Sequence, residues 1–254
     1  MRAYTYIDRG SARVGNSFLE RSWSTFLGVT LSIRDRGTGW EWLSRKTTYD
    51  SAPHTQGLPL TGDEFLLSST NAMFRPFDFG YVEWSEENNV LGAVLSACWT
   101  GSQVDVEMRA FAFHEHPGIV RTLSIKNKSS ETLGLEQSLL ESFSIRKDIL
   151  TTMEPLPQIT LPTSWETPKC GVIATSGNRG ILVAAAGKGH MLLENNTYGA
   201  SHNEIIELTP GTLFSFPPTF LFAYPAPFSL AAKSLYLDLL KAWGEIEILR
   251  TREQ

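Results

Sequence analysis

The residues from Val104 to Phe113 alternate in polarity, and this alternation limits the possible folds more than any other feature of the sequence. Every second residue of the run is apolar: Val104, Val106, Met108, Ala110 and Ala112. A period of two is that of a β-strand, because successive side chains point to opposite faces of a sheet. We therefore predict a half-buried strand that becomes apolar on both faces at Phe111 and Phe113.

The segment after this run predicts a hairpin. Pro117 has no amide donor and Gly118 tolerates a positive φ angle, so residues 114–118 end the strand. The chain then returns as a strand over residues 119–126 and, after a polar turn, forms a long strand over residues 133–145. Long strands joined by short polar turns are typical of an antiparallel meander or Greek key.

Similar runs recur through the rest of the chain, separated by turn residues. They cover residues 18–23, 28–34, 79–86, 90–99, 171–175, 180–186, 205–208 and 213–224. About a dozen strands without the spacing of β-α-β units predict an all-β fold, a two-layer antiparallel β-sandwich. A length of 254 residues, of which 42% are hydrophobic, is enough for one large core.

One segment near the end predicts a helix instead. Residues 229–243 contain no Gly or Pro and repeat apolar residues at helical spacing. We expect Gly244 to end this helix. The predicted organisation is a β-sandwich domain over residues 1–228, followed by a linker-like helix and tail over residues 229–254.

The composition excludes several classes of protein. The formal net charge is -5 and no stretch concentrates Lys or Arg, so we expect no nucleic-acid partner. Residues 1–15 contain no apolar block, and no run reaches the roughly 20 apolar residues of a membrane-spanning helix. We therefore expect no membrane association and a cytoplasmic protein.

The two cysteines, Cys98 and Cys170, have no His or Cys at metal-ligand spacing. The sequence therefore predicts no metal site and no disulfide framework, and Cys98 is predicted to be a small buried hydrophobic residue. Phosphate-binding and dinucleotide-binding glycine motifs are absent from the sequence. We expect no cofactor.

Seven tryptophans are the first indication of a ligand. The face of an indole ring stacks on the C–H face of a sugar, while the sugar hydroxyls bind polar side chains. Trp40, Trp42 and Trp165 lie in turn-like or proline-rich surroundings and are the candidates for sugar binding. Packing in the core is the alternative for each of them, and it is our prediction for Trp99 and Trp243.

A second candidate group stands at the end of the first predicted strand, where Glu115 lies between His114 and His116. Imidazole and carboxylate groups are suited to acid–base catalysis at neutral pH, and the two histidines are also candidates for sugar binding. The alternative is a solvated hairpin tip. Glu194 and Glu204 are possible partners of a histidine, but no spacing rule selects either of them.

Three segments, in chain order, carry a resemblance to a known family. Residues 14–24 contain Asn-Ser-Phe-Leu-Glu-Arg, residues 117–136 contain Val-Arg-Thr-Leu-Ser-Ile-Lys-Asn and Leu-Gly-Leu-Glu, and residues 208–217 begin with Leu-Thr-Pro-Gly. These segments resemble strands at the start, middle and end of the sandwich domain in family 36 glycoside hydrolases, the α-galactosidases and their relatives.

The resemblance implies a galactose-mutarotase-like β-supersandwich and a linker helix, which in that family leads into a catalytic (β/α)8 barrel. The two catalytic aspartates of the barrel have no counterpart among the 254 residues. We therefore expect a carbohydrate-binding or accessory domain that is not catalytic by itself. Its ligand would be a galactoside or glucoside, and its partner a catalytic barrel domain or a second copy of the chain. In that family, loops of the sandwich domain wall the sugar pocket or assist oligomerisation, and here residues 46–63 or the loop around Trp165 would play that part.

Two alternatives remain open. An aldose 1-epimerase shares the same fold and uses a histidine acid and a glutamate base, which would be His114 or His116 and Glu194 or Glu204 here. A sandwich with only a structural or protein-interaction role is the other.

Overall fold

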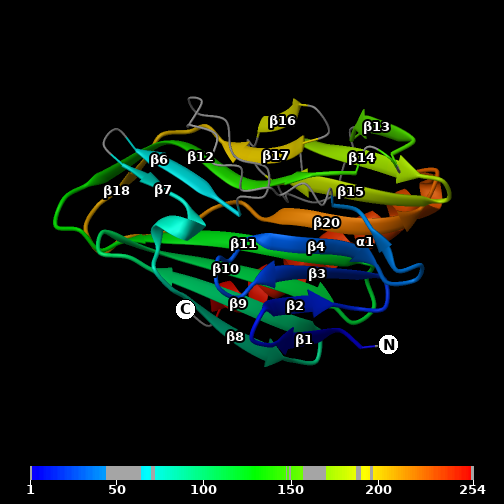
Figure 1. Cartoon of the computed structure of the whole chain (residues 1–254), viewed down its shortest axis with the longest axis horizontal. Helices are drawn as coiled ribbons and strands as arrows, with labels where there is room; N and C mark the ends of the chain where they lie inside the picture. The colour runs from blue at the N-terminus through cyan, green and yellow to red at the C-terminus, as the bar shows by residue number, and fades with distance from the viewer. Residues whose placement is uncertain are drawn as a thin grey trace.

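The computed structural model describes residues 2–43, 64–69, 72–146, 148, 150–156, 170–186, 190–194 and 197–252. These residues form three antiparallel sheets and one long helix near the C-terminus (Figure 1). The predicted fold class, an antiparallel β-supersandwich with a C-terminal helix, is confirmed.

The first sheet has five strands, which follow one another in space as they do along the chain. They are β1 (Tyr4–Ile7), β2 (Ser11–Gly15), β3 (Leu19–Ser24), β4 (Thr30–Asp35) and β5 (Trp40–Glu41). Sequence periodicity identified β3 and β4 but missed β1, β2 and β5, which are short.

The second sheet has nine strands and forms the centre of the molecule. Its spatial order is β13 (Thr152–Pro155), β14 (Cys170–Ser176), β15 (Arg179–Ala185), β20 (Thr219–Pro225), β11 (Gly118–Asn127), β10 (Val104–Phe113), β9 (Gly92–Thr100) and β8 (Val82–Asn88), and β19 (Leu213–Ser215) pairs with the end of β11. The first predicted strand coincides with β10. The run over residues 213–224 is two strands, because Pro217 and Pro218 supply no amide hydrogen to a ladder.

The third sheet has six strands and extends beside the first. Its spatial order is β16 (His190–Glu194), β17 (Thr197–His202), β12 (Leu133–Ser144), β6 (Leu66–Ser69) and β7 (Met73–Phe74), and β18 (Ile206–Leu208) pairs with the start of β12. A short 3-10 helix, η1 (Pro76–Asp78), follows β7. An isolated bridge between Leu43 and Ile145 links this sheet to the five-stranded sheet.

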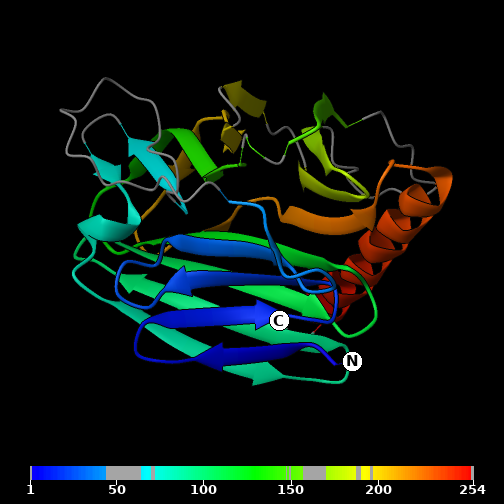
Figure 2. The ribbon, with the colours of Figure 1, turned by 45° about the vertical axis from the view of Figure 1, so that its right-hand side comes forward.

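One hydrophobic core lies between the nine-stranded sheet and the other two sheets. The predicted alternation in β10 is confirmed, since Val106 and Met108 are fully buried in this core. Phe111 and Phe113 point to the opposite face of the sheet and belong to a second core, which helix α1 (Leu230–Arg252) covers (Figure 2). The predicted burial of Trp99 and Trp243 is also confirmed, in the first and second core respectively.

Helix α1 corrects one prediction, because it continues through Gly244 to Arg252. A glycine in a helix costs about 1 kcal/mol relative to alanine. Trp243 and Ile246, on either side of Gly244, are both buried against the nine-stranded sheet. This apolar contact continues the helical repeat past the glycine and offsets its cost.

Cys98 corrects a second prediction, because it is half-buried instead of fully buried. The register of β9 pairs Cys98 with Glu107 on one side and Glu83 on the other, on the outward face of the nine-stranded sheet. Burial raises the pKa of the thiol, and the carboxylates of Asp105, Glu107 and Glu83 raise it further, although a hydrogen bond with Thr100 opposes them. The thiol is therefore protonated at neutral pH.

In the described part of the chain, no helix combines the length and the hydrophobicity that crossing a membrane requires.

The helix–sheet contact generates a test. Leu239 is fully buried and packs on Gly118, where an added Cβ would lie 2.4 Å from Leu239 Cδ2. We expect Leu239→Ala to lower the free energy of unfolding by about 2–5 kcal/mol, because it leaves a cavity in the second core. Leu235→Ala, on the exposed side of the same helix, should cost less than about 1 kcal/mol. Urea unfolding measures both, and equal costs would contradict the assignment of the buried helix face.

Candidate functional site

Trp40 lies at the edge of the five-stranded sheet and is partly open to solvent. It begins β5, the last strand of that sheet, and pairs with Asp35 of β4. The residue is 38% exposed. The turn before it contains Gly37 and Gly39, and Gly39 has a φ angle of +72°, which favours glycine. The tight turn thus presents an accessible indole at the end of a regular strand.

Asp35 is the polar neighbour of Trp40 and is almost fully buried, with 4% of its surface exposed. Its Oδ1 atom accepts hydrogen bonds from the Thr38 backbone N–H, at 2.9 Å, and from the Thr38 hydroxyl, at 3.0 Å. These bonds close the turn and fix the carboxylate. Its other oxygen, Oδ2, lies 3.8 Å from Nε of Arg179.

Arg179 is the contribution of the nine-stranded sheet to this site, because it is the first residue of β15. Its guanidinium group lies over Gly37, where an added Cβ would be 3.4 Å from Nη2. About one third of the side chain is exposed, and Nε makes no hydrogen bond. In this Trp40 cluster, Trp40 supplies an aromatic face and Arg179 a partly exposed guanidinium group, and the buried Asp35 carboxylate lies beside Arg179. An aromatic face and a guanidinium group suit a sugar, which offers both C–H faces and hydroxyl groups.

The other predicted tryptophans differ from Trp40. Trp42 is fully buried in the first core, its backbone N–H donates to the Ile33 carbonyl, and its own carbonyl accepts from the Arg146 N–H. The Trp42 side chain points into the core, so its indole is closed to a ligand in this structure. Trp165 lies outside the described residues, as do residues 46–63.

The two predicted histidines lie at the β10–β11 hairpin. His114 Nδ1 accepts a hydrogen bond from the Ala3 backbone N–H at 2.9 Å, and its Nε2 lies 3.1 Å from the Asn89 carbonyl oxygen. Both ring nitrogens are thus engaged by backbone groups, which requires the tautomer with hydrogen on Nε2. His116 is half-buried, with its ring edge-on to Phe113 at 5.4 Å.

The hairpin that carries these histidines is fixed by Asn16. The Asn16 side-chain amide donates to the carbonyl oxygens of Phe113, at 3.0 Å, and His116, at 2.8 Å. Its oxygen accepts from the backbone N–H groups of Phe18 and Leu19. The segment is therefore an anchored turn in which Glu115 is exposed and both histidines are half-buried, and the described contacts do not bring it to Trp40.

The predicted glutamates lie elsewhere. Glu204 is in the turn between β17 and β18, where its Oε2 lies 3.9 Å from Nε2 of the buried His202. Glu194 ends β16, and its side chain lies outside the described part of the chain. Neither is brought to His114 or His116 by a described contact.

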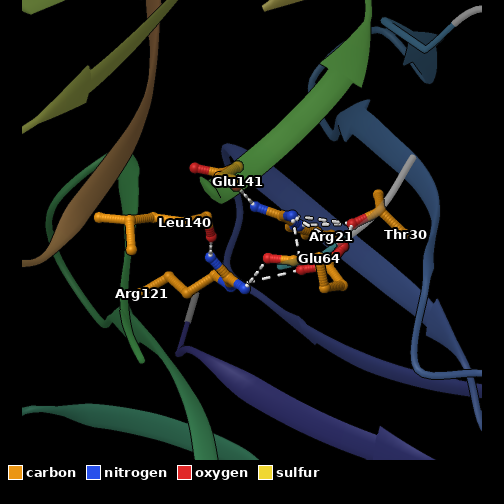
Figure 3. A network of polar contacts seen from close by, with 6 residues as sticks. All are labelled: Arg21, Thr30, Glu64, Arg121, Leu140 and Glu141. Atoms are coloured by element: carbon orange, nitrogen blue, oxygen red, sulfur yellow. Dashed lines mark hydrogen bonds and ion pairs between the residues drawn. The ribbon is translucent and has the colours of Figure 1, made fainter. Parts of the chain in front are cut away.

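Arg21, Glu64, Arg121 and Glu141 form a buried polar network that periodicity did not predict, and it joins all three sheets (Figure 3). Arg21 of β3 donates through Nη1 to Glu141 of β12 and through Nη2 to both carboxylate oxygens of Glu64, at 3.1 and 3.0 Å. The Thr30 hydroxyl donates to Glu64 and accepts from Arg21.

Arg121 of β11 completes this network. Its Nη2 donates to the Glu64 carbonyl oxygen at 2.6 Å, its Nη1 donates to the Leu140 carbonyl oxygen, and its Nε lies 3.3 Å from Glu64 Oε2. The network thus contains two arginines and two glutamates, whose positive and negative charges cancel. Each is at most 3% exposed, so none of them can touch a ligand.

Burial and the neighbouring charges together set the pKa values of the groups in this network. Burial alone would raise the pKa of Glu64, but Arg21, Arg121 and the hydrogen bond from Thr30 outweigh it and hold the pKa below its usual range. Burial likewise opposes the charge on Arg21, yet Glu141 and Glu64 raise its pKa. Burial dominates for Arg121 and lowers its pKa. An ionised Glu64 has no proton to donate, so it does not act as a catalytic acid.

A metal site has no support in the part of the chain that the structure describes, since no three His, Cys, Asp or Glu residues there come together as ligands.

Comparison with solved structures identifies the fold. The chain is similar to the galactosidase domain of an α-galactosidase–sucrose kinase, with a TM-score of 0.54 and 9% identity over 87% of this chain and 42% of that one. It is also similar to a family 36 α-galactosidase from Geobacillus stearothermophilus, with a TM-score of 0.53 and 11% identity over 88% and 41%. A polysaccharide lyase gives a TM-score of 0.53 and 12% identity over 86% and 34%.

These likenesses confirm the fold that the sequence resemblance implied. This chain spans about two fifths of the length of the two α-galactosidase chains. No family model matches the sequence, and no curated protein matches it significantly.

The buried network generates a prediction for Glu64→Gln. At neutral pH the variant should lose about 3–5 kcal/mol of stability, because Arg21 and Arg121 lose the charge between them. In the wild type, the pKa of Glu64 is lower in the folded chain than in the unfolded chain, where it is about 4.3. The contribution of Glu64 to the free energy of unfolding is therefore complete above the unfolded pKa. It is lost as the pH falls through the lower, folded pKa. The variant should therefore lose less stability than the wild type between pH 5 and pH 3.

The matched control is Glu86→Gln, on an exposed position of β8. We expect it to change stability by less than about 0.5 kcal/mol and to keep the acid slope of the wild type. Chemical denaturation at several pH values measures all three proteins, and a Glu64→Gln profile parallel to the wild type would contradict the account of the network.

Proposed function

We propose that this chain is a carbohydrate-binding accessory domain, which binds a galactoside or glucoside and acts beside a glycoside-cleaving catalytic barrel. The observation that carries the proposal is the Trp40 cluster, in which a partly exposed tryptophan at a strand end lies next to the Asp35–Arg179 pair, whose guanidinium group is also partly exposed. The fold supports it, because the same architecture forms part of two longer α-galactosidase chains. At 9–11% identity the likeness carries the fold and not the activity.

The positions of the Asp35, Glu64 and Glu141 carboxylates agree with a domain that binds a sugar without cleaving it. A retaining glycoside hydrolase needs two carboxyl groups about 5–5.5 Å apart on either side of the scissile bond. The Trp40 cluster offers one carboxylate, Asp35, whose oxygens are directed at Thr38 and Arg179. Glu64 and Glu141, which Arg21 bridges, are excluded from solvent. We therefore assign recognition to this domain and catalysis to its partner.

The epimerase alternative needs an imidazole that can give a proton to a sugar. Both nitrogens of His114 are engaged by the backbone of Ala3 and Asn89, and Glu204 lies beside His202 instead. These contacts disfavour His114 as the acid and Glu204 as its glutamate partner.

The test of this proposal is the variant Trp40→Ala. Calorimetric titration with methyl α-galactoside and methyl α-glucoside should show binding of at least one of them to the wild type and at least tenfold weaker binding to the variant, about 1.4 kcal/mol. The reason is that alanine removes the stacking surface and leaves the strand intact.

Tyr81→Ala is the control, since Tyr81 is 71% exposed and precedes β8, outside the cluster. It should bind as the wild type does. Wild-type affinity in Trp40→Ala, or no binding of either glycoside to the wild type, would overturn the proposed function.

A further inference from the structure

A hollow of about 410 Å³ lies at the other end of β11, away from the histidine hairpin. Ser69 at the end of β6 and Ala72 before β7 border it, together with the β9–β10 turn and the β11–β12 turn. Its walls include Ser69, Gln103, Ser129, Glu131, Thr132 and Gly134. The volume falls within the range of small-molecule sites, about 300–1,000 Å³.

The hollow is held in shape by Asn127, which is fully buried beneath it. The Asn127 side-chain amide donates to the carbonyl oxygens of Glu131 and Leu208, both at 2.8 Å. Its oxygen accepts from the Ser129 N–H, at 2.9 Å, and from the Ser129 hydroxyl, at 2.8 Å. One side chain thus fixes both ends of the β11–β12 turn.

A second contact fixes the turn against its neighbour. The backbone N–H groups of Lys128 and Ser129 both donate to the Gln103 carbonyl oxygen, at 2.8 and 3.1 Å. The Lys128 ammonium group donates to the Gly101 carbonyl oxygen and to Asp105, each at 3.0 Å, and so is committed to the β9–β10 side. A ligand entering the hollow would therefore meet walls that are already ordered, which lowers the entropic cost of binding.

The chemistry of the walls selects the ligand. The exposed side chains of Gln103, Glu131 and Thr132 supply an amide, a carboxylate and a hydroxyl group, which can donate to and accept from neighbouring sugar hydroxyls. The Glu131 carboxylate disfavours an anion. Among the described lining residues there is no aromatic ring, so a sugar would be held by its hydroxyl edges and not by stacking.

We propose that this hollow is a second saccharide-binding site, which takes one neutral sugar unit. The choice of a sugar rests on the proposed function, whereas the site itself rests on the hollow and its fixed walls. Because the hollow and the Trp40 cluster share no residue, each site can be removed without touching the other.

Gly134 provides the means of blocking the hollow. It lines the hollow, and an added Cβ would have no protein atom within 4 Å. A Cβ at this position meets no wall atom, so we expect Gly134→Leu to obstruct the hollow. The matched control is Gly80→Leu, because Gly80 has the same open surroundings and lies outside the lining. Gln103→Ala, which removes the amide and leaves the backbone contacts, is a second and milder variant.

The experiment is a titration of backbone amide NMR signals with methyl α-galactoside and methyl α-glucoside. In the wild type, we expect signals of residues 129–134 and signals around Trp40 to shift as two separate sets. Gly134→Leu should abolish the shifts of residues 129–134, Gln103→Ala should weaken that site at least threefold, and Gly80→Leu should retain both sets. Trp40→Ala should remove only the other set.

Each result decides between the two proposals. Shifts at residues 129–134 that survive Gly134→Leu, or their absence from the wild type while the Trp40 set is present, would overturn the second site alone. Shifts at residues 129–134 without any around Trp40 would keep the second site and reject the first. Titration of the wild type without any shift would reject both.

Discussion

The buried pairing of Arg21 with Glu64 and Glu141 is the interaction on which the arrangement of the three sheets depends. Arg21 belongs to the five-stranded sheet, Glu141 to the six-stranded sheet, and Arg121, which also binds Glu64, to the nine-stranded sheet. An apolar core tolerates many small shifts of one sheet over another. A buried ion pair does not tolerate such shifts, because a charge that loses its partner is left both unsolvated and unpaired. The network therefore fixes the relative positions of the sheets.

Fixed sheets explain why both proposed sites lie where different sheets meet. Trp40 and Asp35 come from the five-stranded sheet, whereas Arg179 comes from the nine-stranded sheet. The hollow beside Asn127 lies between turns of the nine-stranded and six-stranded sheets. In both places the binding groups stand on strand ends and tight turns. A sugar can then be recognised without a conformational change of the surrounding loops.

The sequence predicted features that depend on neighbouring residues and missed those that depend on distant ones. Alternation predicted β10 and its two buried faces, because a strand repeats every two residues. The end of helix α1 was predicted at Gly244, since local propensity does not include the contact of Ile246 with a distant sheet. Trp40 was selected as a candidate from its turn, but Asp35 and Arg179 are 144 residues apart and no pattern pairs them. Arg21 was noted within a family-like segment, yet only the fold shows that its partners are buried.

We propose that the sandwich, with its buried charge network, presents a sugar-binding surface at Trp40. A crystal structure of the chain grown with an α-galactoside is the decisive measurement. We expect a sugar ring lying flat on the Trp40 indole, with hydroxyl groups in hydrogen-bond reach of Arg179 and the Arg21–Glu64–Glu141 network unchanged. A sugar bound elsewhere, with the Trp40 indole covered by protein, would contradict it.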